Sequence, residues 1–265
     1  MYTRILIPLD GSKIAETVLP YARTMAGKLR IPVELLTVVD TAAVTARSSA
    51  GEARQVDAIT KDGVQSSLEY LSEVAKTFPG CNVKCMVETG RADEVIIKKG
   101  EADPRSLITM TTHGRSGINL WLLGNVAEKV FRGTTNALFL IRATDDAKTE
   151  GEAVLKSMVV PLDHSGLAES ILPRVAGLAK KLNLPVVYLE NKTKELEKLE
   201  VETVFCVTKE GLSADESAAL GRTSSHSLIA MSSHARAAVS RWVLESVTEK
   251  IVRYSGDPVL VARAT

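Results

Sequence analysis

Hydrophobic and polar positions in the first half of the chain follow two patterns. Between strand-length apolar runs, apolar residues recur every three or four positions, as from Ala15 to Leu29, which is the spacing of one helix face. Ser12 stands just before that stretch and is its candidate N-cap. Further helices are predicted through residues 64–75, 91–100 and 124–132. The apolar runs predict strands at residues 4–9, 33–39, 82–89, 106–110 and 137–141.

Strands that alternate with helices predict βαβ units, and therefore an α/β fold with a mainly parallel sheet covered by helices on both faces. In such sheets, ligands bind beyond the carboxyl ends of the strands. Asp10, Val38 and the segment from Met110 to Gly114 all follow predicted strands at that end. We therefore expect them to share one crevice.

The pattern occurs twice. Residues 8–20 return as residues 161–173, and residues 112–132 return as residues 233–253. We therefore expect two tandem domains of the same fold, at 1–145 and 153–265, each with a five-stranded sheet. The offset is 153 residues at Asp10 and Asp163 but 121 at His113 and His234, so the second copy is shortened by about 32 residues between its second and third strands. Its strands are expected near residues 157–162, 186–190, 201–208, 227–231 and 258–262.

Composition narrows the class of protein. The formal net charge is +1, which favours neither nucleic acid nor a membrane surface as a partner. No apolar run reaches the roughly 18 residues of a membrane span, and the N-terminus enters a strand pattern rather than a signal peptide. The three cysteines form no CxxC pair, and Cys81 and Cys85 fit strand positions. We expect a reduced, soluble, cytoplasmic protein.

One segment carries candidate chemistry. Gly114 and Gly117 follow the fourth strand, where glycines allow backbone N–H groups to line a concave turn. Gly124, Asn125 and Val126 then open a helix, whose free N–H groups attract anions. The pair suits a row of phosphates, although an ordinary strand–loop–helix connection would use the same residues. The Walker motif and the nucleophile elbow are absent, and His113 lacks companions for a metal site.

Several segments together resemble the universal stress protein family. The resemblance covers nearly the whole chain as two tandem copies and implies the Rossmann-like, adenine nucleotide α-hydrolase-like fold. The segments that carry it are Pro8–Asp10, Leu36–Asp40, Thr111–Gly117 and Leu122–Val130.

The resemblance implies an ATP and Mg²⁺ site. Nucleotide-binding members carry G-x-x-G, nine residues, then G followed by Ser or Thr; Gly114 and Gly124 match, while Thr111 and Asn125 depart. Thr111 still offers its backbone N–H, and the amide of Asn125 can donate to a phosphate oxygen. The implied binding residues are Asp10, Val38, Met110, Thr111, Gly114, Arg115, Gly117, Gly124, Asn125 and Val126.

Individual roles follow from the same resemblance. Asp10 would contact ribose hydroxyls or metal-bound phosphates, or would only form the turn at Gly11. Val38 would bind adenine through its backbone, with Met110 packed nearby. Arg115 would lie near the γ-phosphate or be structural, since its copy Arg236 persists without the glycines.

The second copy carries Ala235 and Glu245 where the first has glycines, and a carboxylate repels phosphates. We therefore expect one nucleotide per chain, in the first half. Family members pair through their fifth strands, which a tandem chain can do internally; whether tandem chains also form a homodimer stays open.

The leading hypothesis is an ATP-binding stress-response switch with an unknown protein partner and at most slow hydrolysis. The alternatives are an interaction module without nucleotide and, third, a ligase-type enzyme of the same fold.

Overall fold

The ten strands that the structure describes form one continuous sheet. The computed structural model describes residues 1–40, 53–112, 123–142, 148–162, 166–189, 203–206, 226–234, 251–252 and 256–264. The strands are β1 (Arg4–Pro8), β2 (Val33–Val39), β3 (Val83–Thr89), β4 (Ser106–Thr111), β5 (Ala137–Ile141), β6 (Ser157–Pro161), β7 (Val186–Leu189), β8 (Thr203–Cys206), β9 (Ser227–His234) and β10 (Val259–Ala264). The helices are α1 (Lys13–Glu16), α2 (Leu19–Leu29), α4 (Ala53–Ala75), α5 (Ala92–Glu101), α6 (Asn125–Gly133), α7 (Gly166–Glu169) and α8 (Leu172–Leu182).

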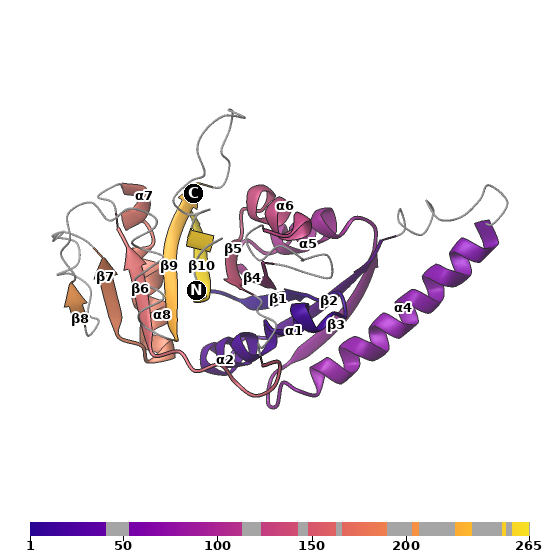
Figure 1. Cartoon of the computed structure of the whole chain (residues 1–265), viewed down its shortest axis with the longest axis horizontal. Coiled ribbons are helices and arrows are strands. Elements are labelled where there is room, and N and C mark those ends of the chain that lie inside the picture. The colour runs from indigo at the N-terminus through magenta and orange to yellow at the C-terminus, as the bar shows by residue number, and fades with distance from the viewer. Residues whose placement is uncertain are drawn as a thin grey trace.

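The sheet consists of two five-stranded halves joined at its centre. The strand order is β3-β2-β1-β4-β5-β10-β9-β6-β7-β8, so the second half repeats the first in reverse (Figure 1). Neighbours within each half are parallel, whereas β5 and β10 pair antiparallel, with Leu140 opposite Val259. The internal pairing of the two fifth strands is thereby confirmed, and it leaves neither of these strands as an exposed edge.

Helices cover both faces of the first half of the sheet. Ile5, Leu6 and Ile7 in β1 are all fully buried, as expected for a strand with helices on both sides. Ile5 and Ile7 belong to the apolar core under α2, α4 and α8, whereas Leu6 belongs to the core under α5 and α6. This alternation follows from the two-residue period of a strand, and it confirms the predicted α/β fold.

The first predicted helix is two helices in the structure. α1 ends at Glu16 and α2 begins at Leu19, with Pro20 in the first turn of α2. A proline ring clashes with the carbonyl four residues earlier, which here belongs to Glu16, so one continuous helix cannot form. The second half repeats the break, because α7 ends at Glu169, four residues before Pro173.

The segment between the halves lies against α2. The Ala153 N–H donates to the Pro20 carbonyl at 3.1 Å, and the Thr24 hydroxyl donates to the Ala153 carbonyl at 2.8 Å. Arg23, 8% exposed, donates to the carbonyls of Thr149 and Gly151 at 2.9 and 2.8 Å. The described part of the linker is therefore bonded to the first half at Thr149, Gly151 and Ala153 before the chain enters β6.

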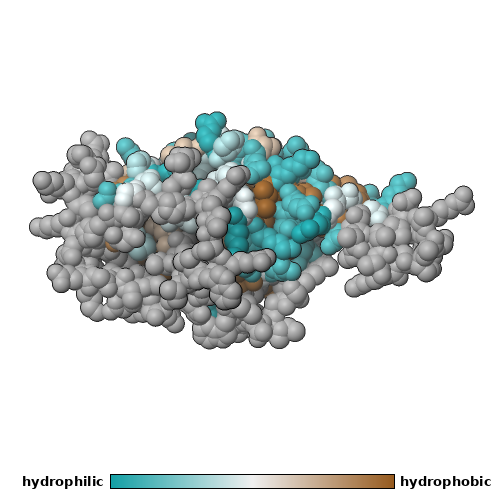
Figure 2. Space-filling model, turned by 90° about the horizontal axis from the view of Figure 1, so that it is seen from above, coloured by the Kyte–Doolittle hydropathy of each residue, from teal (hydrophilic) through white to brown (hydrophobic). Residues whose placement is uncertain are grey.

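Seen from above, the described surface of the first half is mainly hydrophilic, with a small hydrophobic area among polar residues (Figure 2). Within the described parts of the chain, none of the helices combines the length and apolarity that crossing a membrane requires.

Candidate functional site

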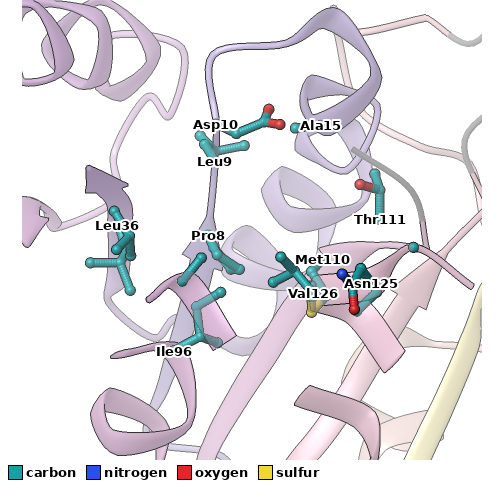
Figure 3. A pocket seen from close by; sticks show the side chains of 14 residues that line it. Pro8, Leu9, Asp10, Ala15, Leu36, Ile96, Met110, Thr111, Asn125 and Val126 are labelled. Carbon is teal, nitrogen blue, oxygen red and sulfur yellow. The ribbon is translucent and has the colours of Figure 1, made fainter. Parts of the chain in front are cut away.

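A cavity of about 230 Å³ lies at the carboxyl ends of β1, β2 and β4, beside the first turn of α6 (Figure 3). This is the position where open parallel sheets bind ligands. Its lining residues are Pro8, Leu9, Asp10, Ala15, Leu36, Val38, Ala92, Ile96, Met110, Thr111, Gly124, Asn125, Val126 and Ala127.

Backbone bonds hold the ends of β1 and β2 together at the cavity. The Leu9 N–H donates to the Leu36 carbonyl at 2.8 Å. The buried hydroxyl of Thr37 donates to the Leu9 carbonyl at 3.0 Å. These bonds hold Leu9 and Leu36 in position as part of the apolar lining of the cavity, and Asp10 follows Leu9 directly at the cavity.

Asp10 forms the turn that leads into α1. Its Oδ1 accepts hydrogen bonds from the Ser12 N–H at 2.9 Å and the Ser12 hydroxyl at 2.6 Å. Ser12 Oγ in turn accepts from the Ala15 N–H at 3.1 Å, which confirms Ser12 as the N-cap. Gly11 lies between them at φ 77°, a conformation that favours glycine. The turn role of Asp10 is therefore present in the structure, and it holds the carboxylate at the cavity.

The start of α6 forms the opposite wall. The Gly124 N–H donates to the Thr112 carbonyl at 2.7 Å, which places the helix start directly beside the end of β4. Gly124 caps α6 with φ −59° and ψ 148°, and its N-terminus has no side-chain cap. Its first N–H groups and the positive end of its dipole therefore suit an anion. Any residue can adopt this backbone conformation, so the backbone at position 124 does not require glycine.

The cavity has an apolar side and a polar side. In Figure 3, Pro8, Leu36 and Ile96 lie together, while Thr111 and Asn125 lie near the start of α6 and Asp10 lies on the loop after β1. An apolar wall suits a flat aromatic ring, and the polar groups suit hydroxyls and an anion. None of the described lining residues is basic, so a polyanion here would need a cation to offset the charge of Asp10.

The structure brings together seven of the ten residues predicted for the site, which line the cavity: Asp10, Val38, Met110, Thr111, Gly124, Asn125 and Val126. The other three, Gly114, Arg115 and Gly117, lie outside the described residues, as do Asp163, Ala235 and Glu245 of the second copy. Ala92 and Ile96 of α5 were not predicted to line the site. Nothing in their sequence marks them, because only the packing of α5 against the sheet brings them there.

Groups of three His, Cys, Asp or Glu side chains able to hold a metal ion do not occur within the described ranges. Asp10 is the acidic residue among the described lining residues of the cavity.

Comparison with known proteins identifies the family. The universal stress protein family matches residues 1–142 and 187–263, and the chain belongs to this family. Universal stress proteins MJ0531 and MJ0577 of Methanocaldococcus jannaschii are 25% and 26% identical to it. Each alignment covers 54% of this chain, and they cover 83% and 96% of those proteins, respectively.

Solved structures share the whole two-half architecture. The crystal structure of a universal stress protein from Archaeoglobus fulgidus DSM 4304 matches with a TM-score of 0.75 and 18% identity, covering 99% of both chains. A putative universal stress protein from Pseudomonas aeruginosa matches with a TM-score of 0.65 and 15% identity, covering 99% of this chain and 93% of that one. At these identities the likeness shows the fold.

Proposed function

We propose that this universal stress protein binds one ATP with Mg²⁺ per chain, in the cavity of its first half, and acts as a nucleotide-dependent switch in a stress response. The observation that carries the proposal is the convergence of three strand ends and the uncapped start of α6 on one cavity. These elements are far apart in sequence, and the same residues resemble the family's nucleotide pattern.

The two sides of the cavity fit the parts of a nucleotide. The adenine ring would lie among Leu36, Val38 and Ile96, where the backbone of Val38, one residue before the end of β2, would offer polar groups to the ring edge. The ribose hydroxyls would donate to the carboxylate of Asp10. The phosphates would extend to the start of α6, where free N–H groups and the helix dipole stabilise negative charge.

The negative charges of ATP and Asp10 would repel each other unless a cation lies between them. ATP carries several negative charges, and Asp10 adds another at the cavity. Like charges about 4 Å apart cost about 4 kcal/mol at an effective dielectric constant of about 20. Mg²⁺ binds phosphate and carboxylate oxygens and would remove this repulsion. Binding should therefore weaken strongly when Mg²⁺ is chelated.

Isothermal titration calorimetry with ATP tests the proposal, once with Mg²⁺ and once with excess EDTA. We expect saturable binding near one site per chain, with lower affinity in EDTA. A stoichiometry of two would contradict the inactive second copy. Absence of binding, together with no thermal stabilisation by excess ATP, would favour an interaction module without nucleotide. Thr111 and Asn125, which depart from the nucleotide-binding pattern, are the residues that favour this alternative.

A further inference from the structure

A second cavity, of about 420 Å³, lies at the junction of the two halves. The first half contributes the residues before β1, β4 and β5, and the second half contributes one side of α8 and the end of β10. The N-terminus lies at this junction, beside β10 (Figure 1). The lining residues are Met1, Tyr2, Pro104, Arg105, Thr135, Ala137, Pro173, Arg174, Gly177, Leu178 and Arg263.

The cavity wall is cationic. Arg105, just before β4, and Arg174 of α8 line it from two different halves, and none of its described lining residues is acidic. Asp103 lies close by, but its carboxylate accepts bonds from the Thr3 hydroxyl and the Arg105 N–H. Arginine is the side chain best suited to hold carboxylate or phosphate groups, because its planar donors bind two oxygens at once.

Two polar groups in the wall are buried. Arg263 is 5% exposed, donates to the Phe131 carbonyl and the Ser233 hydroxyl, and stacks 4.8 Å from the centroid of the Phe131 ring. The Arg263 guanidinium therefore packs with α6 and β9, on the face of the sheet opposite α8, and burial lowers the pKa of Arg263 to about 10. Tyr2 Oη is buried without a hydrogen-bond partner among the described residues, and burial raises the pKa of Tyr2 to about 12 despite the charge of Arg174.

The internal repeat shows how this cavity arises. At the offset of 153 residues, α8 corresponds to α2, so Arg174 corresponds to Tyr21 and Gly177 to Thr24. On α2, Thr24 bonds to the linker at Ala153, and the linker covers that helix. α8 carries glycine where α2 has the threonine and arginine where α2 has the tyrosine, so it has a smaller side chain and a positive charge at these equivalent positions.

We propose that the junction cavity binds a small organic anion with at least two carboxylate or phosphate groups, held between Arg105 of the first half and Arg174 of the second. The ligand would contact both halves at once, and its binding would stabilise their junction. This site is separate from the nucleotide cavity, because the two share no lining residue.

Calorimetric titration of the full chain tests the proposal, with citrate as the carboxylate probe and pyrophosphate as the phosphate probe, in buffer without divalent cations. Arg174→Gln is compared with Lys180→Gln, which removes the same charge from an exposed position of α8 outside the cavity. Gly177→Thr restores the residue of the first copy, and its Cβ would lie 3.3 Å from Met1 Cε.

We expect one site per chain for at least one probe. The affinity should be at least about tenfold lower in Arg174→Gln and unchanged in Lys180→Gln. Gly177→Thr should also weaken binding. Absence of binding for both probes, or equal affinities in Arg174→Gln and Lys180→Gln, would overturn the proposal. ATP binding should be unaffected by Arg174→Gln, so failure of either site is recognised separately.

Discussion

Replacing Gly124 by glutamate puts into the first copy the residue that the second copy has at Glu245. The backbone tolerates the change, because Gly124 has φ −59° and ψ 148°, which every residue can adopt. Its N–H bond to Thr112 and its carbonyl bond from Glu128 involve only main-chain atoms. A carboxylate at a helix N-terminus also interacts favourably with the dipole, by about 0.3–1 kcal/mol. The fold should therefore persist.

The effect on binding should be large. Gly124 lines the cavity of the first half at the start of α6, where the phosphates are proposed to lie. A carboxylate about 4 Å from one phosphate charge costs about 4 kcal/mol at an effective dielectric constant of about 20. Since about 1.4 kcal/mol corresponds to a factor of ten in affinity, the loss should be about a thousandfold.

Titration calorimetry of Gly124→Glu with ATP and Mg²⁺ measures this loss, and Gly124→Gln is the matched control of equal size without charge. We expect Gly124→Gln to retain most of the affinity that Gly124→Glu loses, with similar melting temperatures for both variants. Wild-type affinity in a folded Gly124→Glu variant would refute the phosphate position. Equal losses in the two variants would show that size, and not charge, excludes the ligand.

Two further predictions concern the junction between the halves. Arg23→Met removes the hydrogen bonds to Thr149, Gly151 and the Thr77 hydroxyl and should lower the free energy of unfolding by about 2–3 kcal/mol. Urea unfolding measures this loss. The control is Lys28→Met, at an exposed position of the same helix, which should change the free energy of unfolding little. Burial raises the pKa of Asp257 to about 6 from 3.8, so the folded chain binds the proton of this carboxyl more tightly than the unfolded chain does. The protonated carboxyl therefore contributes stability that is fully present below about pH 4 and is lost as the pH rises through 6. Because Asp257 is only partly buried, we expect this loss to be about 1 kcal/mol and absent in Asp257→Asn; parallel pH profiles for the two proteins would contradict the assignment.

The predicted strands of the first half agree with the structure to within one residue at each end. Strands such as β4, which is buried at every position, stand out because a sheet covered on both faces needs continuous apolar runs. The first helix was less well predicted. Its apolar spacing continues through residues 15–29, and only the clash of Pro20 with the Glu16 carbonyl divides it.

The candidate site was predictable where its residues end a strand or begin a helix. Asp10, Val38 and Asn125 are such positions, and the repeat and the turn glycines draw attention to them. Ile96 lies within α5 and carries no such mark. It reaches the cavity because α5 packs over the ends of β2 and β4, which depends on contacts between segments far apart in sequence.

The sequence by itself determined the type and order of the elements, the duplication and seven residues that line one cavity. These follow from local periodicity, from backbone preferences at glycine and proline, and from comparison of one copy with the other. Only the tertiary structure decided that the linker binds along α2 and that a cationic cavity opens beside α8. Both result from antiparallel pairing of β5 with β10, which brings side chains of the two halves together across distances that no local pattern records.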